Sequence, residues 1–218
     1  RLEGCLDDWV FMAAACLDLY ESDFDPLWVR EARGLVDRAV ERFWDQEDGA
    51  FFFTAESQQD LVLRSKTGYD GALPSGNSVA ALTLFRLARL TGEEGYGDHA
   101  LRILRAYRQN IEQMPAAFGA MLWAMDFYLD TAKEVAVIGR ASAAETQEFL
   151  RLLRQSFVPN KVVAFREDPA AAGGSQDVPL LEGKTAQGGK PTAYLCEHFR
   201  CKVPTTDAEM FEKMLQGD

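Results

Sequence analysis

Lys66-Thr67-Gly68-Tyr69-Asp70-Gly71-Ala72-Leu73-Pro74-Ser75-Gly76-Asn77-Ser78 is a polar, glycine-rich connector in a chain of 218 residues. It separates a short β-prone segment from a long apolar stretch. Loops that combine Gly, Asp and Asn form either demanding turns or binding sites, and often both. We therefore expect the fold and any functional site to be organised around this connector.

Upstream of the connector, apolar residues recur at three- and four-residue spacing and predict helices over residues 3–22 and 26–43. Asp25 is the expected N-cap of the second helix, and Pro26 is its expected first residue. Residues 50–54 and 61–64 are β-prone, and a hairpin signal, Asp48-Gly49, comes just before them. They predict a small β-hairpin insertion.

Downstream of the connector, the same spacing predicts three more helices, over residues 78–90, 93–113 and 115–129. Gly92 stands where a left-handed helix cap is needed. Residues 20–43 and 90–111 follow one plan, in which a short acidic turn precedes an aromatic residue and then an amphipathic helix. This repeat predicts antiparallel helix pairs.

The pattern changes after residue 131. Residues 134–139 and 162–165 are apolar and predict two parallel strands, with a helix between them that Ser142 would cap and Glu145 would support. Residues 192–196 predict a third strand, and 207–215 a terminal helix. We therefore expect a helical portion over residues 1–131 and a small C-terminal α/β appendage over 132–218.

Composition limits the classes of partner. A formal net charge of −11 argues against binding to nucleic acid or to an anionic membrane surface. No apolar run reaches the roughly 18 residues that span a bilayer, and the N-terminus has no signal-peptide pattern. Four cysteines in a chain of this size do not make a disulfide scaffold, so a reducing, cytoplasmic setting is expected. The opening directly into a helix suggests a piece of a longer polypeptide.

The first candidate site combines carboxylates with aromatic and polar groups: Asp7, Asp8, Trp9, Tyr69, Asp70, Ser75 and Asn77. At the mouth of a helical ring, such carboxylates would suit acid–base work, with Asp70 and Asp8 as catalytic candidates, and the remaining side chains would bind a sugar. The alternative is structural. Asp7 and Asp8 would then cap a helix, Asp70 would hold a turn, and Ser75 or Asn77 would cap the next helix.

The second candidate site is Cys196, His198 and Cys201. It could be a redox pair or part of a metal site, but the cysteine spacing differs from the redox Cys-x-x-Cys motif and no fourth metal ligand is in view. The alternative is two ordinary thiols near the end of a strand. Cys5 and Cys16 are expected to be core residues, and we predict no cofactor.

Several segments match a known family: Leu6-Asp7-Asp8-Trp9, Leu17-Asp18-Leu19-Tyr20-Glu21, Phe43-Trp44-Asp45, residues 70–78, Pro159-Asn160-Lys161-Val162 and residues 196–204. Through them the chain resembles the C-terminal part of the YyaL-like and spermatogenesis-associated thioredoxin-domain-containing proteins. Such proteins carry a thioredoxin-like domain followed by an (α/α)6 toroid similar to that of N-acylglucosamine 2-epimerases and six-hairpin glycosidases. The resemblance implies a mainly α fold, a partial toroid of helical hairpins that lacks the thioredoxin-like domain.

The resemblance implies a function only in outline. We expect a fragment that binds or acts on a saccharide, by hydrolase or epimerase chemistry completed in a missing N-terminal half. Epimerases of this fold use histidines that project into the ring, and this chain has only His99 and His198. The alternative is a non-catalytic interaction or redox-accessory scaffold for a thioredoxin-like domain, so whether the chain is an enzyme stays open. The open edges of half a ring predict self-association, or association with the rest of the chain.

Overall fold

The computed structural model describes residues 4–58, 63–168, 177–197 and 200–217. It divides into two compact units, which are treated separately below. The first comprises the residues up to Ala88 together with Glu93–Leu129, and the second comprises Arg89–Gly92 together with the residues from Asp130 onward. The first unit is helical, and the second contains a four-stranded mixed sheet.

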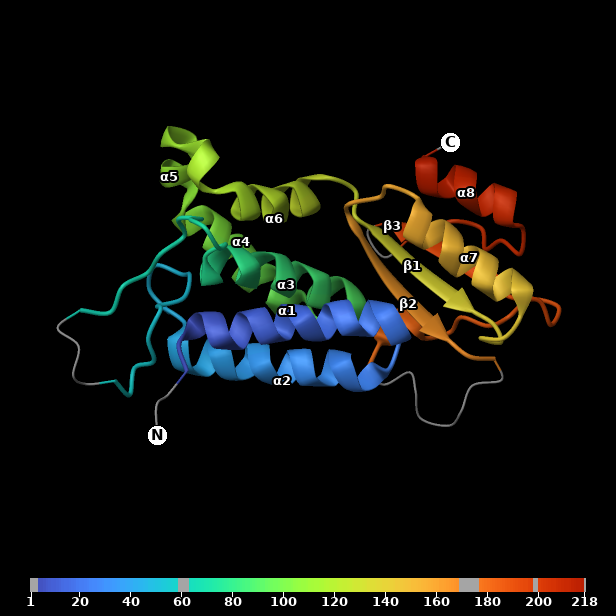
Figure 1. The fold of residues 1–218 in the computed structure, drawn as a ribbon, viewed down its shortest axis with the longest axis horizontal. Coiled ribbons are helices and arrows are strands. Elements are labelled where there is room, and N and C mark those ends of the chain that lie inside the picture. The colour runs from blue at the N-terminus through green and yellow to red at the C-terminus, as the bar shows by residue number, and fades with distance from the viewer. Residues whose placement is uncertain (1–3, 59–62, 169–176, 198–199, 218) are drawn as a thin grey trace. The chain divides into compact units, whose positions relative to one another are not determined.

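The first unit begins with a helical hairpin, α1 (Leu6–Asp23) and α2 (Pro26–Phe43), whose helices lie side by side (Figure 1). Asp25 caps α2 as predicted, because its carboxylate accepts a hydrogen bond from the Leu27 amide at 2.9 Å. Each helix buries one apolar stripe, as its three- and four-residue spacing predicts. The buried stripes consist of Leu6, Val10, Ala13, Leu17 and Tyr20 on α1, and of Val29, Ala32, Val36, Ala39 and Phe43 on α2.

The rest of the first unit follows the connector: α3 (Gly76–Thr91), α4 (Glu94–Ala106), α5 (Arg108–Gln113), the 3-10 turn η1 (Pro115–Ala117) and α6 (Gly119–Leu129). Within this unit α3 is the most enclosed helix, and Ala81, Leu84 and Leu87 are fully buried on it. Gly92 has φ +72°, which confirms the left-handed end predicted there.

One prediction for this unit is wrong, and another is described only in part. The single helix over residues 93–113 is broken at Tyr107, whose φ of −100° and ψ of 5° depart from helical values. The predicted β-hairpin is described only in part, because Leu61 and Val62 lie outside the described residues. Phe51 forms an isolated bridge with Trp44, and the Phe53 amide donates to the Ser65 carbonyl at 2.8 Å. The extended run is interrupted because Ala50 is left-handed, at φ +64°, and because the Asn77 side chain takes up both backbone groups of Phe51.

The second unit is built on β1 (Lys133–Ile138), β2 (Lys161–Arg166), β3 (Thr192–Glu197) and β4 (Arg200–Cys201), in the sheet order β2-β1-β3-β4. The parallel pairing of β1 with β2 confirms the predicted β-α-β unit, and β3 pairs antiparallel with both β1 and β4. Helices α7 (Ala144–Gln155) and α8 (Ala208–Gln216) pack together, with Phe149 against Phe211 in an edge-to-face contact (Figure 1). A short 3-10 turn, η2, covers Pro179–Leu181.

The predicted cap of the helix between the strands is wrong. The N-cap of helix α7 is Ala143, one residue after the expected Ser142, and no side chain caps the helix. Ser142 therefore lies before the helix. Among the described residues, no helix is long and apolar enough to cross a membrane.

Candidate functional site

Asp70 joins the connector to α6. Its Oδ1 accepts a hydrogen bond from the Ser75 amide at 2.8 Å, and its Oδ2 accepts from the amides of Ala120 at 2.8 Å and Met121 at 3.4 Å. The backbone amide of Asp70 in turn donates to the Ala117 carbonyl at 2.8 Å. A carboxylate in this place serves the free amides and the positive dipole end at the start of α6. Both oxygens of this proposed catalytic residue are thus engaged by the backbone.

Ser75 and Asn77 organise the start of α3. The Ser75 hydroxyl accepts from the Ser78 amide at 3.1 Å, which makes Ser75 the cap of the helix. Asn77 is 1% exposed. Its Oδ1 accepts from the Phe51 amide at 2.8 Å, and its Nδ2 donates to the carbonyls of Phe51 and Thr67, both at 2.9 Å. Nδ2 also reaches the Tyr107 hydroxyl at 3.2 Å, so that one side chain ties three segments to α3.

Asp7 meets the connector at Gly76. A Cβ added to Gly76 would lie 2.3 Å from the Asp7 Oδ1, so the carboxyl group packs directly against this glycine. Burial, and then the charge of Asp8, raise the pKa of the Asp7 carboxyl, although the Gly76 amide opposes the shift. The surroundings of Asp7 therefore disfavour its charged form.

Asp8 and Trp9 are engaged elsewhere on α1. The Asp8 Oδ2 accepts from the Cys5 amide at 2.9 Å, in the helix-capping role of the structural alternative. Trp9 packs against Phe43, with the Arg42 guanidinium 5.4 Å from the centre of its ring. His99, on α4, contacts the Trp44 ring and the Gly95 carbonyl. The structure thus brings Asp7, Ser75 and Asn77 together at the start of α3, and gives Asp8 and Trp9 local roles.

A cavity of about 330 Å³ opens beside the connector. We call it the connector pocket, and it is lined by Lys66, Thr67, Gly68, Tyr69, Tyr107, Asn110, Gln113, Met114 and Phe118. Tyr69 is 60% exposed at this pocket, whereas burial raises the pKa of the Tyr107 hydroxyl well above its usual range. Its walls combine aromatic rings with the side-chain amides of Asn110 and Gln113.

Gly68 allows the connector to lie close to the Tyr107 ring in the pocket. A Cβ on Gly68 would lie 2.7–2.9 Å from three ring atoms of Tyr107, closer than real side chains approach. The glycine therefore lets the connector pass directly over the ring, while Asn77 holds the hydroxyl. Of this lining, sequence reasoning identified only Tyr69 as a site residue. The sequence predicts only a helix through Tyr107, and no signal in it marks Asn110 or Gln113.

The second candidate site also differs from expectation. Cys196 and Cys201 stand opposite each other in β3 and β4 and form a disulfide, so the interpretation as two ordinary thiols is wrong. His198 lies outside the described residues. Within the part of the chain that is described, no group of three or more His, Cys, Asp or Glu residues could hold a metal ion. Cys16 is buried as expected, whereas Cys5 is partly exposed at the start of α1.

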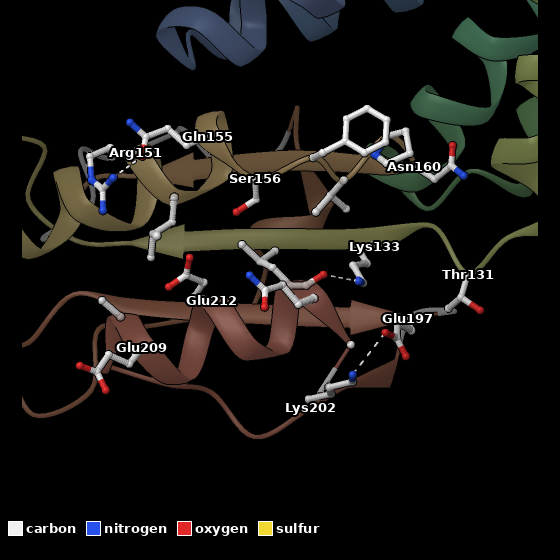
Figure 2. Close-up of a pocket in the computed structure, with 18 of the residues that line it drawn as sticks. Thr131, Lys133, Arg151, Gln155, Ser156, Asn160, Glu197, Lys202, Glu209 and Glu212 are labelled. Carbon is white, nitrogen blue, oxygen red and sulfur yellow. Dashed lines mark hydrogen bonds and ion pairs between the residues drawn. The ribbon is translucent and has the colours of Figure 1, made fainter.

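The second unit has a wider groove between α7 and α8, with a volume of about 960 Å³ (Figure 2). The cationic side chains that line the groove bind other groups of the protein. Lys133 donates to the Leu215 carbonyl at the end of α8, Arg151 pairs with Glu148, and Lys202 pairs with Glu197 at 3.3 Å. Glu209 and Glu212 project from α8 along the same groove (Figure 2). The groove is therefore a mixed-charge surface with an acidic excess, which does not suit an anion.

Comparison with known proteins gives one consistent relation. The chain is 32% identical over 213 residues to human spermatogenesis-associated protein 20, and the alignment covers 97% of this chain. The rat protein of the same name is also 32% identical over 97% of the chain, and uncharacterized protein B0495.5 of Caenorhabditis elegans is 26% identical over 95%. The chain is homologous to spermatogenesis-associated protein 20. This relation confirms the spermatogenesis-associated part of the resemblance seen in the sequence.

The match covers only part of the relative. The chain spans 27% of the length of human spermatogenesis-associated protein 20, so the activity and partners of the whole relative do not follow from this alignment. No family model matches the chain. The toroid arrangement, the saccharide and the thioredoxin-like domain remain predictions from the resemblance.

Proposed function

We propose that this chain contributes a binding site for a neutral, polyhydroxylated ligand of the saccharide class, located at the connector pocket. The observation that carries the proposal is the lining, in which Tyr69 and Tyr107 present aromatic rings and Asn110 and Gln113 present amides. Aromatic faces stack on sugar rings, and amide groups both donate to and accept from hydroxyls. A volume of about 330 Å³ falls within the range of small-molecule pockets.

In this proposal Asp70 and Asn77 position the pocket. Asp70 anchors the connector on α6, and Asn77 holds Tyr107 and the Thr67 carbonyl, both of which belong to pocket residues. Of the nine residues that line the pocket, none is a carboxylate or a histidine. Hydrolysis or epimerisation needs a general acid and a general base. We therefore assign binding to this chain, and place any such chemistry on groups supplied by other parts of a longer protein.

The test is direct binding of a panel of mono- and disaccharides, measured by ligand-observed NMR and titration calorimetry on the full chain. Tyr69→Ala removes one stacking face, worth about 1 kcal/mol, and should weaken binding severalfold. The matched control is Trp123→Ala, since Trp123 is 54% exposed in the same unit and does not line the pocket. Equal binding by wild type and Tyr69→Ala, or no binding at millimolar saccharide, would overturn the proposal.

The second candidate is the non-catalytic interaction or redox-accessory scaffold. It is favoured by the hydrogen bonds that tie Asp70 and Asn77 to backbone groups, which is what a purely structural connector requires. Under this alternative, wild type binds no saccharide, and variants at Asp70 and Asn77 change only stability. The same binding panel, combined with urea unfolding of the variants, separates the two functions.

Self-association is a further part of the proposal. Met12 on α1, and Trp123 and Leu129 on α6, are 54–70% exposed apolar side chains of the first unit. Exposed apolar surface favours association. Sedimentation equilibrium should give a mass that rises with protein concentration, and a constant monomer mass would contradict this part.

A further inference from the structure

The disulfide between Cys196 and Cys201 is the chemically reactive group that the proposed function does not use. It links β3 to β4 at a position where the two cysteines are paired in the antiparallel register. We propose that this pair is a dithiol–disulfide exchange site, which reacts through Cys201 and takes a dithiol reductant as its partner. This proposal lies in the second unit and is independent of the saccharide site.

The two cysteines differ in access. Cys196 is 1% exposed, because β3 lies between β1 and β4 in the sheet. Cys201 is exposed on β4, an edge strand of only two residues. Exchange depends on which sulfur a thiolate can reach. An incoming thiolate therefore reaches Cys201, and Cys196 is the protected partner that closes the bridge again.

The charges beside Cys201 favour the same assignment. Arg200 and Lys202 flank it directly in the chain, and the Lys202 ammonium pairs with Glu197 at 3.3 Å. Cationic neighbours favour the thiolate form of a cysteine and attract an anionic attacking group. Opposite Cys196, the β1 residue in register is Glu134, a fully buried acid. Glu134 is paired with the Arg89 guanidinium at 3.1 Å, so the cations next to Cys201 in the chain are Arg200 and the Glu197-paired Lys202.

The exchange takes place in two steps, in which atoms and electrons balance. A thiolate of the reductant attacks the sulfur of Cys201 and forms a mixed disulfide, while the bond between Cys196 and Cys201 breaks. Cys196 leaves with the electron pair and takes a proton from solvent. The second thiolate of the reductant then attacks the reductant's other sulfur, which is bonded to Cys201 in the mixed disulfide, and Cys201 is released as a thiolate. The protein gains two electrons, and the dithiol becomes a cyclic disulfide.

The surrounding structure permits this exchange without unfolding. β3 stays paired with β1 along its full length, from Thr192 to Glu197. The chain beyond the bridge is held separately, since the Lys202 amide donates to the Leu195 carbonyl at 2.9 Å and Thr205 exchanges backbone hydrogen bonds with Ala193. Opening the bridge therefore releases a short edge segment and leaves the sheet in place.

The first experiment measures the redox equilibrium of the full chain. The protein is equilibrated with mixtures of reduced and oxidised dithiothreitol, quenched in acid, unfolded, alkylated and weighed by mass spectrometry. We expect a reversible gain of two alkyl groups, at Cys196 and Cys201, with an unchanged circular dichroism spectrum. Free thiols at both positions in the fully oxidised mixture, or a bridge that opens only when the sheet unfolds, would overturn the proposal.

The second experiment tests the order of attack. Cys196→Ser and Cys201→Ser are made in a Cys5→Ser background, since Cys5 is the other cysteine with some exposure. Each folded variant is mixed with oxidised glutathione, and the adduct is mapped by peptide mass. We expect a mixed disulfide on Cys201 in the Cys196→Ser variant and little adduct on Cys196 in the Cys201→Ser variant. Equal or reversed labelling would contradict the assignment to Cys201.

Discussion

The Asp70 carboxylate lies 2.8 Å from the backbone amide of Ala120, at the start of a helix fifty positions further along the chain. The same side chain accepts from the Ser75 amide at 2.8 Å, just before α3 begins. One carboxylate thus ties the connector to the starts of α3 and α6. Asp70 therefore has a structural role, although its sequence context also indicates catalysis.

Replacement of Asp70 should therefore destabilise the first unit. Asp70→Ala leaves the amides of Ser75 and Ala120 without their acceptor and should lower the free energy of unfolding by about 2 kcal/mol. Asp70→Asn keeps one carbonyl acceptor and should cost less. Urea unfolding followed by circular dichroism measures both. The control is Asp98→Asn, a change to an exposed acid on α4. A loss no greater than the control's would argue against the anchoring role.

The titration of the Asp7 carboxyl should be visible in the pH dependence of stability. Its folded pKa is raised above the ordinary 3.8, mainly by burial, so the folded state favours the protonated form. The associated stability is present below pH 3.8 and is lost as the pH rises through the higher folded pKa.

Asp7→Asn removes this titration. The variant should be more stable than wild type at pH 7, and the difference should shrink toward pH 3, as measured by urea unfolding at each pH. Taking the difference between the two proteins cancels the other carboxylates. An Asp7→Asn variant that is less stable than wild type at pH 7 would show that the charged form makes a net favourable contact.

Gly68 offers a test of the close approach that shapes the connector pocket. Gly68→Ala places a methyl group 2.7–2.9 Å from the Tyr107 ring, so the ring or the connector must shift. The expected cost is about 1–3 kcal/mol of unfolding free energy, together with weaker ligand binding. Gly71→Ala is a matched control in the same connector, because a Cβ there meets nothing within 4 Å. Similar stability for the two alanine variants would contradict the packing of Gly68 on Tyr107.

Much of the fold was predictable because it depends on local rules. The apolar spacing predicts both ends of α2, and the capping preferences of Asp25 and Pro26 predict where it begins. Strands β1 and β2 followed from short apolar runs on either side of a helix. These features need no information from distant parts of the chain.

The connector pocket depends on distant parts, and for that reason it was only partly predictable. Tyr107 breaks a helix without a glycine or proline, because its ring packs on Gly68 and its hydroxyl contacts Asn77. The Asn77 side chain also takes up the backbone groups of Phe51, so that this residue of the predicted hairpin is held by a distant side chain. Side-chain contacts between separate segments override local propensity at Tyr107.

Asn77 should therefore be the most sensitive position in the connector. Asn77→Ala leaves the amide and carbonyl of Phe51 and the Thr67 carbonyl without their partner in a site that is 1% exposed. Unsatisfied buried backbone groups cost about 1–3 kcal/mol each, so the total loss should exceed that of Asp70→Ala.

Asn77→Asp sharpens this prediction. Aspartate has nearly the same shape and can still accept from the Phe51 amide, but it loses both donors and places a charge against two carbonyl oxygens. It should be as destabilising as alanine at pH 7 and less so at low pH, where a protonated carboxyl regains one donor. Urea unfolding at the two pH values measures the difference. An Asn77→Asp variant with wild-type stability at pH 7 would show that the donors of Asn77 contribute nothing, and that the tie between Phe51, Thr67 and α3 rests on the acceptor alone.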